Sequence, residues 1–279
     1  MPNQDWHGSG RVNAVIVGAQ KCATTSLFYA LARSPEIAGS QLKETNYFSK
    51  TKDWKTGLDG YHTLFDRQKP VLLEASPSYT SVPNFNHAIW HDMAEYNSDM
   101  RLIYIVRPPI DRLRSAYRHA FERGATEANF ETYALTDPRA LTRSHYAFQI
   151  KPFIETFGRK QVLLLRFEDV VGQQAAVLRQ VARFLGVDAG FVDNLEAMHL
   201  NDGERGRFHR RFDRPNLALR ALGRVAPTAA TWWKRRHSPR LKGPVIIPDA
   251  LRARLIEHLG PDIAEFERIS GWHLDSWRR

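Results

Sequence analysis

The 279-residue chain has little cysteine and no long hydrophobic run: its one thiol is Cys22. A single cysteine excludes a disulfide framework and any zinc or iron–sulfur site built from several thiolates. A membrane-spanning helix needs about 18 or more consecutive apolar residues, and the first residues lack the cationic and apolar stretches of a secretory signal. We therefore expect a cytoplasmic protein in a reducing compartment.

Internal repeats and low-complexity tracts are also absent, and most of the chain carries no net charge. The sequence has 40 Lys and Arg against 30 Asp and Glu, a formal charge of +10. Residues 203–242 hold 12 Lys and Arg against two acids, and the rest of the chain has 28 of each sign. The excess charge favours an anionic partner and belongs to one segment.

The apolar residues alternate between short β-like runs and helical stretches, with 43% hydrophobic residues overall. This alternation is typical of an α/β fold with a mainly parallel sheet and helices on both faces. The pattern predicts strands at 12–17, 71–73, 102–106 and 162–167. It predicts helices at 24–33, 84–96, 110–123, 173–185, 249–259 and 261–269.

We expect a single domain over residues 1–279. Its parts would be a core of sheet and helices at 12–200, a basic, loop-rich cap at 201–248 and C-terminal helices at 249–279. The cap is irregular and rich in helix breakers, which predicts loops on the surface rather than a second domain.

A candidate phosphate-binding loop follows the first strand, from Gly18 to Ser26, and leads into a helix. Backbone N–H groups and the helix N-terminus can hold a phosphate in such a loop. The nucleotidase pattern G-x-x-x-x-G-K-[ST] fails here, because Ala23 replaces its second glycine and Thr24 its lysine. Instead, Lys21 lies inside the loop.

Arg107 follows the strand at 102–106, where a kinase or ATPase would carry an aspartate for magnesium. Arginine does not bind magnesium, but its guanidinium can hold a phosphate through two parallel hydrogen bonds. The sequence therefore predicts a nucleotide with a phosphate near this strand end and no required metal. His87 and His91 are four residues apart, a spacing that two zinc ligands on a helix can have, but no third ligand is evident and we do not expect a zinc site.

These two motifs resemble the sulfotransferases that use 3′-phosphoadenosine 5′-phosphosulfate, in a P-loop-like fold. The resemblance is to the branch with heparan sulfate sulfotransferases and many bacterial members. Residues 15–26, VIVGAQKCATTS, resemble its 5′-phosphosulfate loop, and residues 107–117, RPPIDRLRSAY, its 3′-phosphate element. Ordered similarity runs from about 14 to 169, and residues 266–277 match a common closing pattern.

The resemblance implies a set of cofactor contacts. They are Gln20, Lys21, Cys22, Ala23, Thr24, Thr25 and Ser26 in the loop, Arg107 and Ser115 at the 3′-phosphate, Tyr146, and Arg205, Gly206 and Arg207. For Tyr146, which opens a helix, a packed core side chain is an equal alternative. For residues 205–207 the alternative is a solvated basic loop.

The same resemblance implies the catalytic groups. Glu44, just ahead of Tyr47 and Phe48, takes the place of the general base, and Lys21 would neutralise the leaving phosphate oxygen. An exposed Lys43–Glu44 pair is the alternative for the glutamate.

A second acidic candidate, Glu74, follows the next strand, and we expect it with Ser76 and Tyr79 near the acceptor. An ion pair with a loop lysine is the alternative for Glu74. In the resembling family, glycosaminoglycan-directed members usually carry lysine where this chain has Ala75. Its absence counts against an acceptor site that holds polyanionic glycans.

The combined prediction is a sulfotransferase that moves a sulfuryl group from 3′-phosphoadenosine 5′-phosphosulfate to a hydroxyl of a carbohydrate, glycolipid or small natural product. It would release 3′,5′-bisphosphoadenosine without a metal or a nucleic-acid partner. The alternatives are a P-loop kinase or nucleotidase, and a nucleic-acid or membrane-surface binding module based on residues 203–242. Peripheral membrane contact through that segment stays open.

Overall fold

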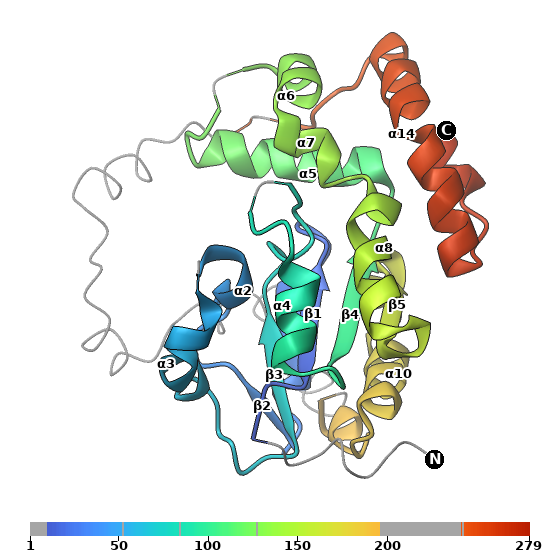
Figure 1. The fold of residues 1–279 in the computed structure, drawn as a ribbon. Helices are drawn as coiled ribbons and strands as arrows, with labels where there is room; N and C mark the ends of the chain where they lie inside the picture. Colours follow the sequence, from blue (N-terminus) through green and yellow to red (C-terminus); the bar gives the residue numbers. More distant parts are fainter. Residues whose placement is uncertain (1–9, 52, 84, 127, 196–240, 242) are drawn as a thin grey trace.

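The computed structural model describes residues 10–195, apart from 52, 84 and 127, together with residue 241 and residues 243–279 (Figure 1). Five strands form one sheet in the order β2-β3-β1-β4-β5, and all pairs are parallel. The strands are β1 (Ala14–Gly18), β2 (Ile37–Gly39), β3 (Val71–Ala75), β4 (Arg101–Val106) and β5 (Val162–Arg166). The prediction of a single α/β domain with a parallel sheet is confirmed.

Helices cover both faces of the sheet. The described α-helices are α1 (Thr24–Leu31), α2 (Tyr47–Lys50), α3 (Leu58–His62), α4 (Ile89–Tyr96), α5 (Pro109–Glu122), α6 (Phe130–Thr136), α7 (Pro138–Thr142), α8 (Tyr146–Phe157), α9 (Phe167–Gly172), α10 (Gln174–Leu185) and α14 (Asp249–Ser270). Helices α4 and α8 pack together on one face, with α14 against α8, and α1 and α10 pack together on the other (Figure 1). The chain crosses from β1 to β2 in one direction and from β3 to β4 in the other, and because crossovers between parallel strands are nearly always right-handed, the connecting helices α1 and α4 are expected on opposite faces.

The core lies between the sheet and these helix layers. β1 and β3 are buried along their whole length, and β4 is buried except at Arg101. Strands covered on both faces have nearly continuous apolar sequences, which is why the sequence pattern predicted them. The carboxyl ends of β1, β3 and β4 meet at one edge of the sheet, below α5 (Figure 1). Ligands of open α/β sheets bind at this kind of edge.

The C-terminal helix differs from the prediction, because α14 is one helix that continues through Pro261. A proline inside a helix costs about 3 kcal/mol. The buried side chains keep a spacing of four or three residues across it: Leu251, Leu255, Leu259, Ile263 and Phe266. Burial of each contributes about 1.5–3 kcal/mol, which together outweighs the proline. Asp262 also accepts hydrogen bonds from the backbone N–H groups of Ala147 and Phe148 at the start of α8.

Two smaller differences concern short elements. β2 has only three residues and was not predicted, because three residues are too few to show a period of two. α4 begins at Ile89, five residues later than expected. The helix predicted to open at Tyr146 is present as α8.

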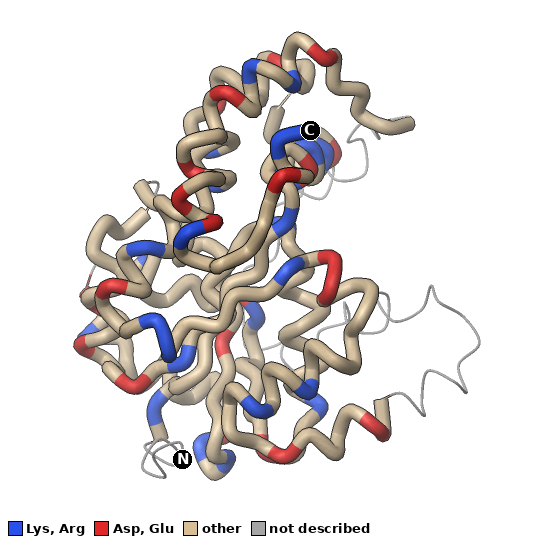
Figure 2. Tube along the Cα trace, turned by 90° about the vertical axis from the view of Figure 1, so that its right-hand side faces the viewer, with Lys and Arg blue, Asp and Glu red and all other residues tan. Residues whose placement is uncertain are grey.

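The basic segment, residues 203–242, lies outside the described residues except for Leu241. The predicted cap at 201–248 is thus described only at residue 241 and from residue 243 onward. In the described part of the chain, Lys and Arg are interspersed with Asp and Glu along the trace, and neither sign gathers in one region (Figure 2). This mixture agrees with the equal counts of both signs outside the segment. None of the helices described here is long and apolar enough to span a lipid bilayer.

Candidate active site

The loop between β1 and α1 has the backbone shape of an anion site. A Cβ on Gly18 would lie 2.0 Å from Thr80 Oγ1 and 2.8 Å from the Tyr104 ring, so only glycine fits there. Lys21 and Ala23 have φ angles of 72° and 58°, left-handed conformations that cost about 1–2 kcal/mol per residue. Turns of this kind form concave nests of N–H groups that bind anions. The loop leads directly into the positive N-terminus of α1.

Arg107 stands at the end of β4 with its guanidinium held in place. Its Cζ lies 4.2 Å from the ring centroid of Phe167, and Nη1 donates to the carbonyl of Lys21 at 3.3 Å. Arg107 Nε is buried and has no hydrogen-bond partner among the described residues. An unsatisfied buried donor on a permanent cation is costly, so this position fits an anionic group. Ser115, on α5, lines the same cavity.

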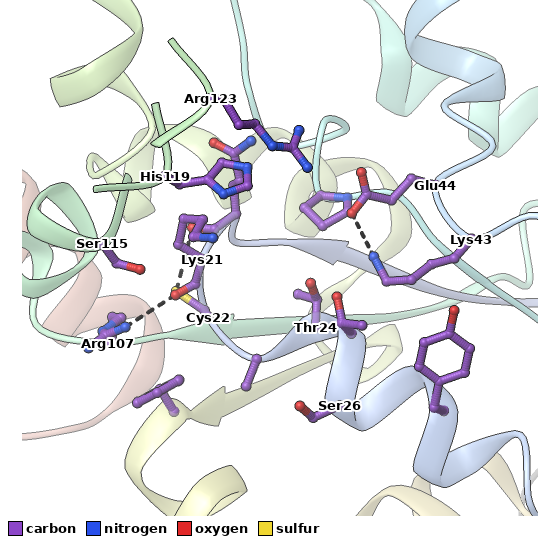
Figure 3. A pocket seen from close by; sticks show the side chains of 16 residues that line it. Lys21, Cys22, Thr24, Ser26, Lys43, Glu44, Arg107, Ser115, His119 and Arg123 are labelled. Atoms are coloured by element: carbon purple, nitrogen blue, oxygen red, sulfur yellow. Dashed lines mark hydrogen bonds and ion pairs between the residues drawn. The ribbon is translucent and has the colours of Figure 1, made fainter. Parts of the chain in front are cut away.

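Glu44 belongs to the loop between β2 and α2, which is attached to the end of β3. Its backbone N–H donates to the carbonyl of Ala75 at 3.1 Å. Lys43 Nζ lies 2.6 Å from Glu44 Oε1, and the two side chains are 11% and 51% exposed (Figure 3). The glutamate is therefore an accessible carboxylate with a cation held against it from the inner side.

These elements enclose a cavity of about 690 Å³ (Figure 3). This volume lies within the range of about 300–1,000 Å³ that is usual for ligand sites. The lining residues are Gln20, Lys21, Cys22, Ala23, Thr24, Thr25, Ser26, Tyr29, Lys43, Glu44, Pro77, Arg107, Ser115, His119, Arg123 and Phe167.

Burial and mutual repulsion between cations determine the protonation of this cavity. Burial lowers the pKa of Lys21, and the nearby charge of Arg123 lowers it further. Burial, followed by the charges of Lys21 and Arg123, lowers the pKa of His119 to about 4, so its imidazole is neutral at pH 7. Burial raises the pKa of Cys22 to about 12, which leaves its thiol protonated and unreactive.

The charges on the cavity wall are predominantly positive. Four cations, Lys21, Lys43, Arg107 and Arg123, surround one carboxylate, Glu44. Such a cavity concentrates anions. Across the described residues, three or more His, Cys, Asp or Glu side chains nowhere gather in an arrangement that could hold a metal ion.

The structure brings together most of the residues that the sequence singled out. Residues 20–26, Glu44, Arg107 and Ser115 all line the cavity. Arg205, Gly206 and Arg207 lie outside the described residues. Their closure over the cofactor stays a prediction.

Tyr146 does not line the cavity. Its side chain is 1% exposed, and its ring packs against those of Tyr104, Phe266 and Trp277. The structure therefore favours the packed tyrosine over the nucleotide contact. Its position after a loop resembles that of a site residue, but aromatic residues from distant parts of the sequence surround its ring.

Glu74, Ser76 and Tyr79 also lie away from the cavity surface, with no exposed side-chain area. The expectation that they contact the acceptor is corrected, because hydroxyl groups of the protein surround the Glu74 carboxylate. Pro77, from the same segment, does line the cavity.

Six lining residues were missed by the sequence-based site prediction: Tyr29, Lys43, Pro77, His119, Arg123 and Phe167. A signal was present for three of them. His119 and Arg123 follow Ser115 at intervals of four residues, which places all three on one face of α5. Phe167 directly follows β5, at the ligand-binding edge of the sheet.

Fold and site together define an α/β protein with a P-loop-like phosphate site. The chain belongs to the sulfotransferase family, whose domain matches residues 12–202. This family uses 3′-phosphoadenosine 5′-phosphosulfate, so the resemblance seen in the sequence is confirmed.

The individual proteins that are similar to this chain are also sulfotransferases. Mouse heparan sulfate glucosamine 3-O-sulfotransferase 3A1 is 26% identical over 191 residues, which are 64% of this chain and 47% of the relative. The membrane-associated sulfotransferase kil1 of Dictyostelium discoideum is 28% identical over 116 residues, 39% of this chain and 23% of the relative. The chain thus spans about half the length, or less, of these curated relatives.

A solved structure covers nearly all of the chain. The sulfotransferase from Alicyclobacillus acidocaldarius superposes with a TM-score of 0.68 and 26% identity, over 96% of this chain and 99% of that one. The similarity extends over the helices around the sheet as well as the phosphate loop.

Proposed function

We propose that this chain transfers a sulfuryl group from 3′-phosphoadenosine 5′-phosphosulfate to a hydroxyl of a carbohydrate, glycolipid or small natural product. The observation that carries this proposal is that Lys21, Arg107, Ser115 and Glu44 line one cavity. A phosphate loop alone would serve any nucleotide enzyme. The accessible carboxylate beside it supplies the base that a hydroxyl acceptor needs.

The donor would be held at both ends by groups that the cavity already presents. The loop N–H groups and the hydroxyls of residues 24–26 suit its 5′ side, and Arg107 with Ser115 suits its 3′-phosphate. The unpartnered Nε of Arg107 supports this fit. When bound, the donor supplies an activated sulfuryl group.

Glu44 and Lys21 would act on opposite sides of the transfer. The Glu44 carboxylate accepts the proton of the acceptor hydroxyl, which makes the oxygen nucleophilic. Lys21 neutralises the charge that develops on the departing phosphate oxygen. Because burial lowers the pKa of Lys21, its ammonium is also a better proton donor to that oxygen.

The number of charged side chains on the cavity wall supports an acceptor with little negative charge near its reacting hydroxyl. The donor carries about four negative charges, counting roughly two on its 3′-phosphate, and the described wall has only four cations, so none is left over for an anionic acceptor. Lys43 is already paired with Glu44. Ala75, at the position of the lysine in glycosaminoglycan-directed members, is fully buried.

Transfer of ³⁵S from labelled donor tests the proposal with three acceptors: a heparan sulfate oligosaccharide, a galactosylceramide vesicle and a simple phenol. Glu44→Gln should lower turnover by about 10²–10⁴-fold, while the Kd for 3′,5′-bisphosphoadenosine stays within about threefold, measured by calorimetry. Glu95→Gln is the matched control, because Glu95 also pairs with a lysine, Lys55, but lies outside the cavity.

Two outcomes would contradict the proposal separately. Full turnover by Glu44→Gln would remove Glu44 as the base. A wild-type protein that does not bind bisphosphoadenosine at millimolar concentration would remove the donor site.

The two alternatives gain no support. A kinase or nucleotidase disagrees with family membership and with Arg107 at the end of β4. A nucleic-acid or membrane-binding module rests on residues 203–242, nearly all of which lie outside the described part.

A further inference from the structure

Glu74 is a buried acid near the carboxyl end of an inner strand of the sheet. It lies in β3, opposite Val15 of β1, and its side chain has no exposed area. Acidic side chains are almost never fully buried unless they are paired. In the described part of the chain, however, Glu74 forms no ion pair.

Four hydroxyl groups take the place of a cation. Thr45 Oγ1 and Ser76 Oγ donate to Glu74 Oε1 at 2.5 Å each, and Tyr79 Oη donates to it at 2.7 Å. Tyr61 Oη donates to Oε2. A carboxylate has about four acceptor sites, so this cluster satisfies it. Burial and the charge of Glu74 raise the pKa of Tyr61 and of Tyr79 well above the usual tyrosine value, so both hydroxyl groups stay protonated and donate to the carboxylate.

This hydroxyl cluster, Glu74 with Thr45, Tyr61, Ser76 and Tyr79, is attached to the loop that carries Glu44. Thr45 is the next residue after Glu44 and binds Glu74 directly. The backbone N–H of Asn46 donates to Ser76 Oγ at 3.0 Å, and Ser76 in turn donates to Glu74. Two consecutive loop residues therefore depend on one carboxylate.

The loop needs this support because its backbone is in an unfavourable conformation. Glu44 and Asn46 have φ angles of 62° and 53°, in the left-handed region, and neither is glycine. Such conformations persist only where the surroundings impose them. Beyond the loop, the Tyr47 ring stacks on Tyr61 at 4.2 Å. Since Tyr61 also binds Glu74, the carboxylate is linked to residue 47 as well as to residues 45 and 46.

We propose that Glu74 is a positioning residue, whose hydroxyl cluster holds residues 44–46 in the conformation that presents Glu44 to the acceptor hydroxyl. This inference rests on the proposed function, in which Glu44 is the base. A carboxylate is required because an amide offers one acceptor oxygen and turns an NH₂ group toward hydroxyl donors.

Thr45→Val tests the link, because it removes one hydroxyl and nearly preserves the side-chain shape. With ³⁵S-labelled donor and an acceptor that the wild type uses, we expect kcat to fall by at least about tenfold. The KM for the donor should stay within about twofold, because the phosphate loop is unchanged. Thr45→Ser keeps the hydroxyl and should restore kcat to within about threefold of wild type.

Thr63→Val is the matched control, because it removes an exposed hydroxyl that donates only to the carbonyl of Gly60. Its kcat should equal that of the wild type. Unchanged kcat in Thr45→Val, or a rise in KM with kcat preserved, would overturn the proposal.

Hydrogen–deuterium exchange gives a second readout that needs no turnover. In Thr45→Val and Glu74→Gln, the amides of Glu44 and Asn46 should exchange faster, while residues 18–26 remain as in the wild type. Unchanged exchange at both amides would refute the role of Glu74. If the wild type transfers no sulfuryl group, only the proposed function fails, since exchange still reports on the loop. If Glu74→Gln does not fold, Thr45→Val decides alone.

Discussion

Removal of the Arg107 side chain can be compared directly with removal of the ligand group that it is proposed to bind. The perturbation is Arg107→Ala, measured against adenosine 3′,5′-bisphosphate and adenosine 5′-monophosphate. These ligands differ in the 3′-phosphate alone. If Arg107 holds that phosphate, loss of the arginine side chain and loss of the 3′-phosphate must each remove the same interaction.

The structure sets the expected magnitude. A hydrogen bond to a charged group contributes about 1.5–3 kcal/mol, and Arg107 is only partly buried, so we take the lower value. Two bonds from the guanidinium then contribute about 3 kcal/mol, or about 100-fold in Kd. The ring of Phe167 already holds the guanidinium, so little side-chain entropy is lost on binding.

Calorimetry on the four combinations gives the answer. Wild type should bind the bisphosphate about 100-fold more tightly than the monophosphate, and in Arg107→Ala this ratio should fall below about fivefold. Arg139→Ala, which removes an exposed arginine paired with Asp137, should keep the wild-type ratio. If Arg107→Ala weakens both ligands equally, Arg107 does not contact the 3′-phosphate and our reasoning is wrong.

Three further predictions follow from burial. The positive charges of Lys21 and Arg123 help to lower the pKa of His119 to about 4. Because a bound anionic nucleotide offsets these charges, the pKa of His119 should rise on binding, so that binding takes up a proton. Bisphosphoadenosine affinity should therefore increase more from pH 7 to pH 5 in wild type than in His119→Gln, and parallel calorimetric profiles would contradict this. Phe266→Ala should lower the free energy of unfolding by about 3–5 kcal/mol, because its ring is fully buried; a loss below about 1 kcal/mol in denaturant titration would be inconsistent with that packing. Because burial raises the pKa of Cys22 to about 12, a thiol reagent at pH 8 should modify denatured protein much faster than native protein; equal rates would rule this out.

The parts of the site that the sequence predicted are those determined by local chain geometry. The phosphate loop is one strand–turn–helix unit, and Arg107 and Ser115 are joined by β4 and α5. In both units, the residues are close in sequence and joined by regular secondary structure, so their separation in sequence nearly determines the distance between them in space. At Ala23, the sequence shows the missing glycine, and the structure shows the left-handed backbone that makes glycine common there.

The parts that the sequence did not predict depend on contacts between distant residues. Tyr146 is enclosed by Phe266 and Trp277, more than 100 residues later. Glu74 is satisfied by Tyr61 and by Thr45, 13 and 29 residues earlier. An acid or an aromatic residue beside a loop looks alike in sequence whether it faces the ligand or the core.

One wall of the cavity has a length that its secondary structure fixes. Ser115, His119 and Arg123, the last at the C-cap of α5, are spaced by four residues along one helix face. At about 1.5 Å per residue, this wall measures about 12 Å from end to end. Inserting a single residue between them would rotate everything beyond it by about 100°. A substitution at any of these three positions therefore changes the chemistry of this wall, whereas its length stays fixed by the helix.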